Sequence, residues 1–194
     1  MIDSVRPGDH GSIAQLHDAS LRRSLLTALG PLVVTRYYKF ASVSPSEVVR
    51  VARIDGRIAG ACVLSLAPGS LLRRFAVRSP WLMATRLGLR VVTDRDLRQR
   101  LRARIHERDS NPVQLPEVVQ IFTDPAQRGR GIGAKLLAAC EESLREAGER
   151  AYCIHTHRDD NAAGIRFYQR EGFTTVGETD SFGDRFYVMT KGLT

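Results

Sequence analysis

A turn rich in glycine and arginine, residues 127–134, is the part of this sequence best suited to binding an anion. It stands between a β-prone run at 118–123 and an apolar pattern of helical spacing that starts at Ile132. Glycine lets the backbone approach a ligand closely, and the first N–H groups of a helix have no partner within it. The helix dipole and two arginines add positive charge, which suits a pyrophosphate. The residues predicted to hold it are Arg128, Gly129, Arg130, Gly131, Ile132, Gly133 and Ala134.

Two other phosphate-binding loops fit this turn less well. A Walker A loop ends in Gly-Lys followed by a hydroxyl residue that binds magnesium, whereas Leu136 follows Lys135 here. Gly129, Gly131 and Ala134 match a loose dinucleotide-binding pattern, but a Rossmann unit usually carries that turn after its first strand. In this chain the turn comes late, so little sequence remains for a complete doubly wound sheet.

The spacing Arg128-x-x-Gly131-x-Gly133 resembles a signature of the GNAT superfamily of N-acetyltransferases, Gln/Arg-x-x-Gly-x-Gly/Ala. In that family the motif lies between the fourth strand and the third helix and grips the pyrophosphate of acetyl-CoA. Residues 161–173 resemble the second signature, Asn-x-x-Ala-x-x-Phe-Tyr-x-x-x-Gly-Phe. The departure is Gly164, where alanine is usual, and it lowers helix propensity by about 1 kcal/mol at most. The resemblance covers 115–192 well and 1–66 weakly.

The resemblance implies acetyl transfer from acetyl-CoA to a primary amine, by direct attack in a ternary complex. Tyr168 stands where the family has its general acid, and tyrosine's ordinary pKa near 10 keeps it protonated at neutral pH. The alternative is that Tyr168 only packs beside its neighbour in the sequence. Asn161 is expected to contact the CoA arm, and it is also well placed to cap a helix. A backbone N–H in the segment Ile121, Phe122 and Thr123 is expected to polarise the thioester carbonyl.

The general base stays open among Glu117, a histidine and water. Glu117 precedes the glycine turn at the place where several family members carry a glutamate, although a solvated glutamate is an equal alternative. Strand alternation puts Glu117 and Gln120 on opposite faces, so only one of them can face the acceptor. His155 and His157 share a strand face, but they have no evident third ligand, and we predict no metal site.

The expected fold class is α/β, with a central mixed, mostly antiparallel twisted sheet of six to seven strands flanked by helices. Asp55-Gly56 between two β-prone runs predicts a hairpin. His10 and His17 fall on or near the first helix, where we expect solvated histidines. Predicted strands are 2–6, 48–54, 57–64, 118–123, 150–157, 173–176 and 185–190, and predicted helices are about 12–25, 32–40, 132–147 and 161–168.

An arginine-rich stretch at 70–112 is predicted to be a helical insertion between the third and fourth strands. It is either a packed amphipathic element, which we prefer over a nucleic-acid surface, or a wall of the acceptor site. In the second case Arg73, Arg74 and Arg78 suit an acceptor with a negative group beside its amine, such as an amino sugar or an amino acid.

The composition fits one globular domain, 1–194, with a net charge of +8 supplied almost entirely by arginine. The three cysteines form no Cys-x-x-Cys pair, so we expect buried, reduced thiols. No apolar run has the length of a membrane span, and no secretory signal is evident, so we expect a cytoplasmic monomer or homodimer with no membrane partner. The alternative function is a non-catalytic acyl-CoA-binding or nucleic-acid-binding module on the same fold.

Overall fold

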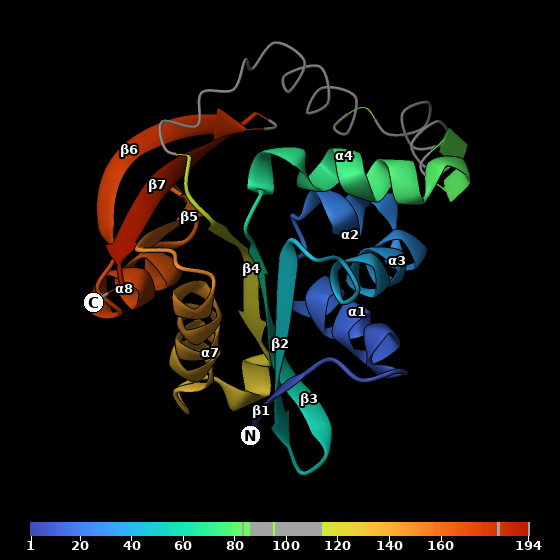
Figure 1. Cartoon of the computed structure of the whole chain (residues 1–194), viewed down its shortest axis with the longest axis horizontal. Helices are drawn as coiled ribbons and strands as arrows, with labels where there is room; N and C mark the ends of the chain where they lie inside the picture. Colours follow the sequence, from blue (N-terminus) through green and yellow to red (C-terminus); the bar gives the residue numbers. More distant parts are fainter. Residues whose placement is uncertain (83, 86–94, 96–113, 182, 194) are drawn as a thin grey trace.

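A seven-stranded sheet in the order β1-β2-β3-β4-β5-β7-β6 forms the centre of the computed structural model, which describes residues 1–82, 84–85, 95, 114–181 and 183–193 (Figure 1). β4 and β5 run parallel, and the other neighbouring strands are antiparallel. The predicted mixed α/β sheet is therefore confirmed. The strands are β1 (Ile2–Ser4), β2 (Glu47–Ile54), β3 (Arg57–Ser65), β4 (Glu117–Thr123), β5 (Ala151–His157), β6 (Thr174–Ser181) and β7 (Asp184–Gly192).

Helices cover both faces of the sheet (Figure 1). The first face carries α1 (Asp9–Ser20), α2 (Leu25–Leu29), α3 (Pro31–Ala41) and α4 (Pro68–Arg78), and the second carries α7 (Ile132–Glu146) and α8 (Ala162–Arg170). The helix predicted over about 12–25 is in fact two helices. α1 ends at Ser20, where the non-helical Leu21 is its C-cap, and the extended Ser24 caps α2 by accepting the N–H of Leu26 at its hydroxyl at 3.2 Å.

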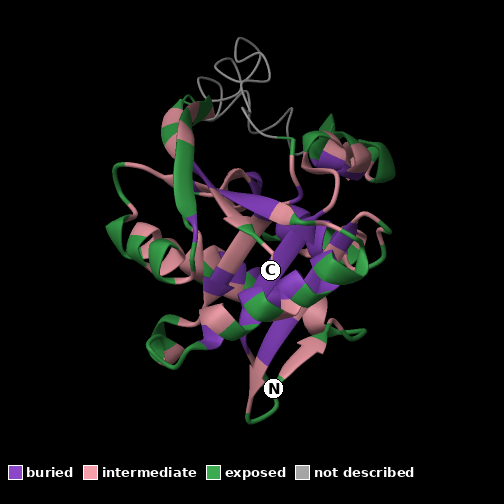
Figure 2. Cartoon of the chain, turned by 60° about the vertical axis from the view of Figure 1, so that its left-hand side comes forward, coloured by how far each residue is buried: buried purple, intermediate pink, exposed green. Residues whose placement is uncertain are grey.

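Two apolar clusters fill the space between helices and sheet. The first lies under α1–α4 and includes Ile13, Tyr37, Tyr38 and Phe75, each at most 1% exposed. The second lies under α7 and α8 and includes Leu136, Leu144, Tyr152 and Ile154. Figure 2 shows the buried residues along the central strands and the exposed ones on the outer helix faces. The central strands of the sheet are thus buried on both sides, and the buried cysteines are free as predicted.

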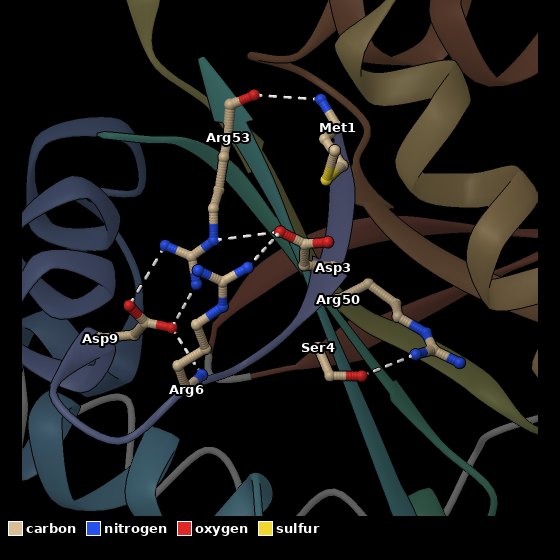
Figure 3. A network of polar contacts seen from close by, with 7 residues as sticks. All are labelled: Met1, Asp3, Ser4, Arg6, Asp9, Arg50 and Arg53. Carbon is tan, nitrogen blue, oxygen red and sulfur yellow. Dashed lines mark hydrogen bonds and ion pairs between the residues drawn. The ribbon is translucent and has the colours of Figure 1, made fainter. Parts of the chain in front are cut away.

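Charged side chains fasten the N-terminal strand to the β2–β3 hairpin (Figure 3). The guanidinium of Arg53 lies 3.3 Å from the carboxylate of Asp3 and donates to both carboxylate oxygens of Asp9, at 3.2 and 2.5 Å. Arg6 adds an ion pair to Asp3 at 3.2 Å. Because these ions stand at the edge of the sheet, away from the residues predicted to act in catalysis, we assign them a structural role.

The described residues of the predicted insertion at 70–112 are 70–82, 84–85 and 95. There α4 buries Leu71 and Phe75, while Trp81 is 83% exposed. Arg74 is paired with the buried Glu47 and donates to the carbonyl of Ala67 at 3.1 Å, so its guanidinium already has partners. The rest of the insertion, including most of its arginines, lies outside the described residues. Among those that are described, no helix is long and apolar enough to cross a bilayer.

Candidate active site

A cleft of about 720 Å³ opens where the two parallel strands part. The described register pairs Glu117 of β4 with Cys153 of β5 and includes no further pair between these strands. Beyond this point the side chains of both strands line the cleft, together with the α1–α2 segment, α8 and the end of the β6–β7 hairpin. The single parallel pairing thus holds the strands together at one end and leaves room for ligands at the other.

A β-bulge places Glu117 and Gln120 on the same face of the sheet. Glu117 pairs with Ser65 of β3 and Gln120 pairs with Val63, so Val119 is the extra residue. Residues 63 and 65 of one strand share a face, and their partners therefore do as well. The prediction that these two side chains face opposite ways is wrong, because it assumed unbroken alternation. Both side chains line the cleft.

Glu117 and His155 form a hydrogen-bonded pair across the two strands. Nδ1 of His155 lies 2.8 Å from Oε1 of Glu117, and the two side chains are 18% and 16% exposed. Both belong to the face that carries α1–α4, because Tyr152 and Ile154, which alternate with His155, pack under α7. Since an ionised carboxylate only accepts hydrogen bonds, Nδ1 carries a proton, and in the neutral form of the imidazole the lone pair is on Nε2.

Cys153 stands beside this pair but is buried. Burial, with a smaller contribution from the charge of Glu117, raises the pKa of its thiol to about 12, so it is not a thiolate at neutral pH. Among the described residues, possible ligand atoms of Glu117, Cys153 and His155 lie within 4.8 Å of one another, a spacing at which they could hold a metal ion. The absence of a metal from the reaction stays a prediction.

A buried hydrogen-bond chain reaches the cleft from the first helix. Nδ1 of His17 lies 2.7 Å from the hydroxyl of Tyr38, which in turn lies 2.6 Å from Oε1 of Gln120. His17 is 0% exposed, and burial lowers its pKa to about 4, so it is neutral at physiological pH. The prediction of a solvated His17 is wrong, because the helix turns this residue inward against Tyr38 and Phe122. His10 is partly buried and contacts Ser42.

Tyr168 lines the cleft from α8. Its ring packs against Phe173, with centroids 5.6 Å apart, and against Phe167 at 5.2 Å. Burial raises the pKa of its hydroxyl well above the ordinary value of 10, so the group keeps its proton at any working pH. In the described part of the chain the hydroxyl has no hydrogen-bond partner. Tyr168 is therefore packed against its neighbours and also has a hydroxyl that can donate. Its geometry is compatible with the packing role and with the general-acid role.

The glycine turn has the backbone conformation that an anion site needs. Gly129 and Gly131 have φ of 78° and 71°, in the left-handed region, and Gly131 begins α7 without a side-chain cap. The helical hydrogen bonds start with the N–H of Lys135 on the carbonyl of Gly131 at 3.1 Å, so the N–H groups of residues 132–134 precede them. Arg128 and Arg130 are exposed beside this end of the helix. The donor set fits a pyrophosphate.

Side chains also pack closely against the backbones of Gly133 and Gly164. A Cβ on Gly133 would lie 3.0 Å from the ring of Phe167, where α7 approaches α8. A Cβ on Gly164 would lie 2.3 Å from Nδ2 of Asn161, whose side chain caps α8 by accepting the N–H of Gly164 at 3.2 Å. Asn161 also donates to Thr156 at 2.8 Å. The departure from the family signature thus leaves space for this cap.

Carboxylates outnumber arginines in the described lining of the cleft. Arg23 bridges Asp160 and Asp184, the latter at 3.0 Å, and so ties the α1–α2 segment to the opposite wall. Arg22 also lines the cleft, as do the carboxylates of Glu117 and Asp180. Four carboxylates against two arginines give no support to the predicted negative group on the acceptor. Arg73 and Arg78 are exposed on α4 and are not among the described lining residues.

The structure brings together some of the predicted site residues and separates others. Phe122 is 5% exposed in the core and Ile132 is 8% exposed, so only their backbones are open to a ligand role. Thr123 accepts at its carbonyl from Ser20 at 3.4 Å. The glycine turn adjoins α7 and is separate from the cleft lining. The predicted residues that line the cleft itself are Glu117, Ile121, Asn161 and Tyr168.

The sequence profile of the Acetyltransferase (GNAT) family matches residues 14–173. The chain belongs to this family. Over 85 residues, this GNAT chain is 32% identical to the mycothiol acetyltransferase of Rhodococcus erythropolis, a match to 44% of this chain and 25% of that protein. Over 74 residues it is 35% identical to the spermine/spermidine N(1)-acetyltransferase of Bacillus subtilis, covering 38% and 47%. The matches thus span between a quarter and a half of these relatives.

Solved structures resemble the GNAT chain over its whole length. An acetyltransferase crystal structure aligns with a TM-score of 0.68 and 19% identity over 100% of both chains. The PaiA N-acetyltransferase of Thermoplasma acidophilum, solved in complex with coenzyme A, aligns with a TM-score of 0.63 and 14% identity over 99% of this chain and 98% of that one. At these identities the likeness establishes the fold.

Proposed function

We propose that this protein transfers an acetyl group from acetyl-CoA to a primary amine of a small cationic molecule. The observation that carries the proposal is the cleft itself, in which a hydrogen-bonded Glu117–His155 pair and the hydroxyl of Tyr168 stand on different walls. Amine acylation needs a base for the amine, a polarised carbonyl and a proton for the leaving thiolate. The cleft offers groups for the first and third of these needs.

His155 and Glu117 serve as the base. The carboxylate holds Nδ1–H of His155 at 2.8 Å, which fixes the tautomer and leaves Nε2 free to take a proton from the amine. A base oriented by a third group is the arrangement by which enzymes commonly activate a nucleophile. The neutral thiol of Cys153 is a poor nucleophile, which favours direct attack of the amine over a covalent enzyme intermediate.

Tyr168 serves as the acid. Its raised pKa keeps it protonated, and its hydroxyl has no competing partner in the described residues. Acetyl-CoA supplies the activated thioester, and its pyrophosphate is assigned to the turn Arg128–Ala134 and the first N–H groups of α7. The backbone of Ile121, Phe122 and Thr123 is assigned to the thioester carbonyl. This backbone lies beyond the single described pairing of β4 with β5, so its N–H groups on the side of β5 are not used in that pairing. This supports the assignment.

The acceptor is assigned as a cationic amine. Four carboxylates line the cleft, and although Asp160 and Asp184 are paired with Arg23, the charges of Glu117 and Asp180 attract an ammonium group before it gives up its proton. The spermine/spermidine acetyltransferase among the relatives is named for substrates of this class. A cytoplasmic location, as a monomer or homodimer, stays part of the proposal.

The test is thiol release from acetyl-CoA in the presence of separate amines. Polyamines, amino sugars, amino acids and a peptide amino terminus form the panel. We expect turnover with at least one cationic amine and little with acceptors that carry an additional carboxylate. A non-catalytic acyl-CoA-binding module would bind acetyl-CoA but release no thiol with any amine, and a nucleic-acid-binding module would retain DNA or RNA with a steep dependence on salt.

A further inference from the structure

Four side chains connect two points of the cleft wall through the core. Ser24 and Gln120 both line the cleft, and His17 and Tyr38 join them while being 0% exposed. Ser24 Oγ lies 3.2 Å from Nε2 of His17, and the chain continues from Nδ1 of His17 through the Tyr38 hydroxyl to Oε1 of Gln120. A chain of this kind is fully buried at its centre and ends at ligand-accessible groups.

The hydrogens of the chain can be assigned from one end to the other. Oε1 of Gln120 only accepts, so the Tyr38 hydroxyl donates to it and must accept from His17. His17 therefore carries its proton on Nδ1, and the lone pair of Nε2 accepts from the Ser24 hydroxyl. Ser24 Oγ still has room to accept the N–H of Leu26 at 3.2 Å. Because a neutral imidazole has one donor and one acceptor, the chain is satisfied without any charge.

This assignment fixes the amide of Gln120. With Oε1 held by Tyr38, Nε2 and its two hydrogens are left for the cleft, and in the described residues no acceptor takes them. Gln120 lies on the face of the sheet that carries α1–α4, together with Glu117 and His155. The glycine turn opens α7 on the opposite face. A ligand that meets Nε2 of Gln120 is thus on the acceptor side, near the base.

We propose that Gln120 is a specificity-determining residue, held by Tyr38 and His17, which donates a hydrogen bond to an oxygen of the acceptor. The inference rests on the proposed acetyl transfer and narrows its acceptor to amines that also carry a hydroxyl or carbonyl oxygen, such as amino sugars or amino alcohols. Plain polyamines lack such an oxygen. An uncharged donor suits a cleft already lined with carboxylates, because it selects an oxygen without repelling the ammonium group.

The test compares amino alcohols of increasing length with alkylamines of the same number of heavy atoms. For each pair the ratio of kcat/KM measures the selectivity for the oxygen. Gln120→Met keeps the length of the side chain and removes the donor, and we expect the preferred ratio to fall about three- to tenfold through a higher KM for the amino alcohol. Tyr38→Phe removes the positioning hydroxyl and should lower the same ratio by less.

Calorimetry supplies a readout that does not depend on turnover. Wild type should bind the preferred amino alcohol more tightly than its alkylamine partner, and Gln120→Met should lose that difference while acetyl-CoA affinity stays unchanged. Gln15→Met, a change at an exposed glutamine of α1, is the control. If no amine is acetylated, the proposed function fails, and the binding difference still decides the role of Gln120. An equal preference in wild type and Gln120→Met, in both assays, would overturn the inference.

Discussion

The imidazole of His155 lies 2.8 Å from the carboxylate of Glu117, the residue at which β4 is paired with Cys153 of β5. The strand pairing fixes the two backbones, while the separation of the strands exposes both side chains to the cleft. A base must be held rigidly, which the strand pairing provides, and must reach a ligand, which the separation of the strands allows. This pair is therefore the first target for mutation.

Replacing Glu117 and His155 should give strongly non-additive losses. We expect His155→Gln to lower kcat by about 10², Glu117→Gln by about tenfold, and the double variant by little more than His155→Gln, because residues that act as a unit lose their function together. Steady-state kinetics on the three variants measure this coupling. Glu146→Gln at the exposed end of α7 is the control. If the loss of kcat in the double variant equals the product of the two single losses, Glu117 and His155 do not act as a unit.

Tyr168→Phe should lower kcat by about 10² and leave acetyl-CoA affinity nearly unchanged, since only the proton donor is removed. Because burial raises the pKa of this tyrosine well above 10, its deprotonation contributes no fall in rate between pH 7 and pH 9 in wild type. Turnover and calorimetry check the two quantities. Tyr187→Phe, which changes a tyrosine of β7 that is absent from the described cleft lining, should be neutral. If Tyr168→Phe turns over as fast as wild type under conditions where the chemical step limits the rate, Tyr168 is not the general acid and has only a packing role.

Gly131→Val should weaken acetyl-CoA binding at least about tenfold, or roughly 1.4 kcal/mol, by placing a side chain at the start of α7. Gly148→Val is a matched control. Both glycines have positive φ, 71° and 79°, and at both a Cβ would meet no atom within 4 Å, but Gly148 stands at the other end of the helix. The two variants should lose similar stability from backbone strain. Equal affinities for acetyl-CoA in the two folded variants would remove the turn from the donor site.

The buried His17 should make the free energy of unfolding fall when the pH drops from 6.5 to about 4. Its pKa is lowered by burial from 6.5 to about 4, so below pH 6.5 the unfolded chain takes up a proton that the folded chain does not. The free energy of unfolding therefore falls as pH drops from 6.5 to about 4 and levels off below, a loss of roughly 3 kcal/mol. Urea denaturation at several pH values, with His17→Gln for comparison, measures this. His17→Gln should flatten that part of the curve, whereas His10→Gln, which changes a partly exposed histidine, should flatten it less.

The sequence by itself predicted the strands, most of the helices and the position of the glycine turn before α7. Apolar periodicity marks α7, and local chemistry explains this success: Asp55-Gly56 forms its hairpin with positive φ at both residues, and the glycine turn needs only its own backbone to expose N–H groups. Tyr168 and Asn161 were predicted from one contiguous motif, and the structure places both in the lining of the cleft, on α8 and at its N-cap. Such features depend on neighbours in the chain, which the sequence displays directly.

The tertiary structure alone decided which side chains meet in the cleft. The extra residue Val119 turns Glu117 to the face of Gln120, and the bulge is visible only from the pairing of β4 with β3. Nothing near His17 in the sequence shows that Tyr38 and Gln120 will satisfy it inside the core, 21 and 103 residues away from it in the chain, so burial could not be inferred. The contact between Glu117 and His155 likewise joins two strands whose described register has one pair. Side chains brought together by long-range pairing have no local signal, because their partners are selected by the packing of the whole sheet.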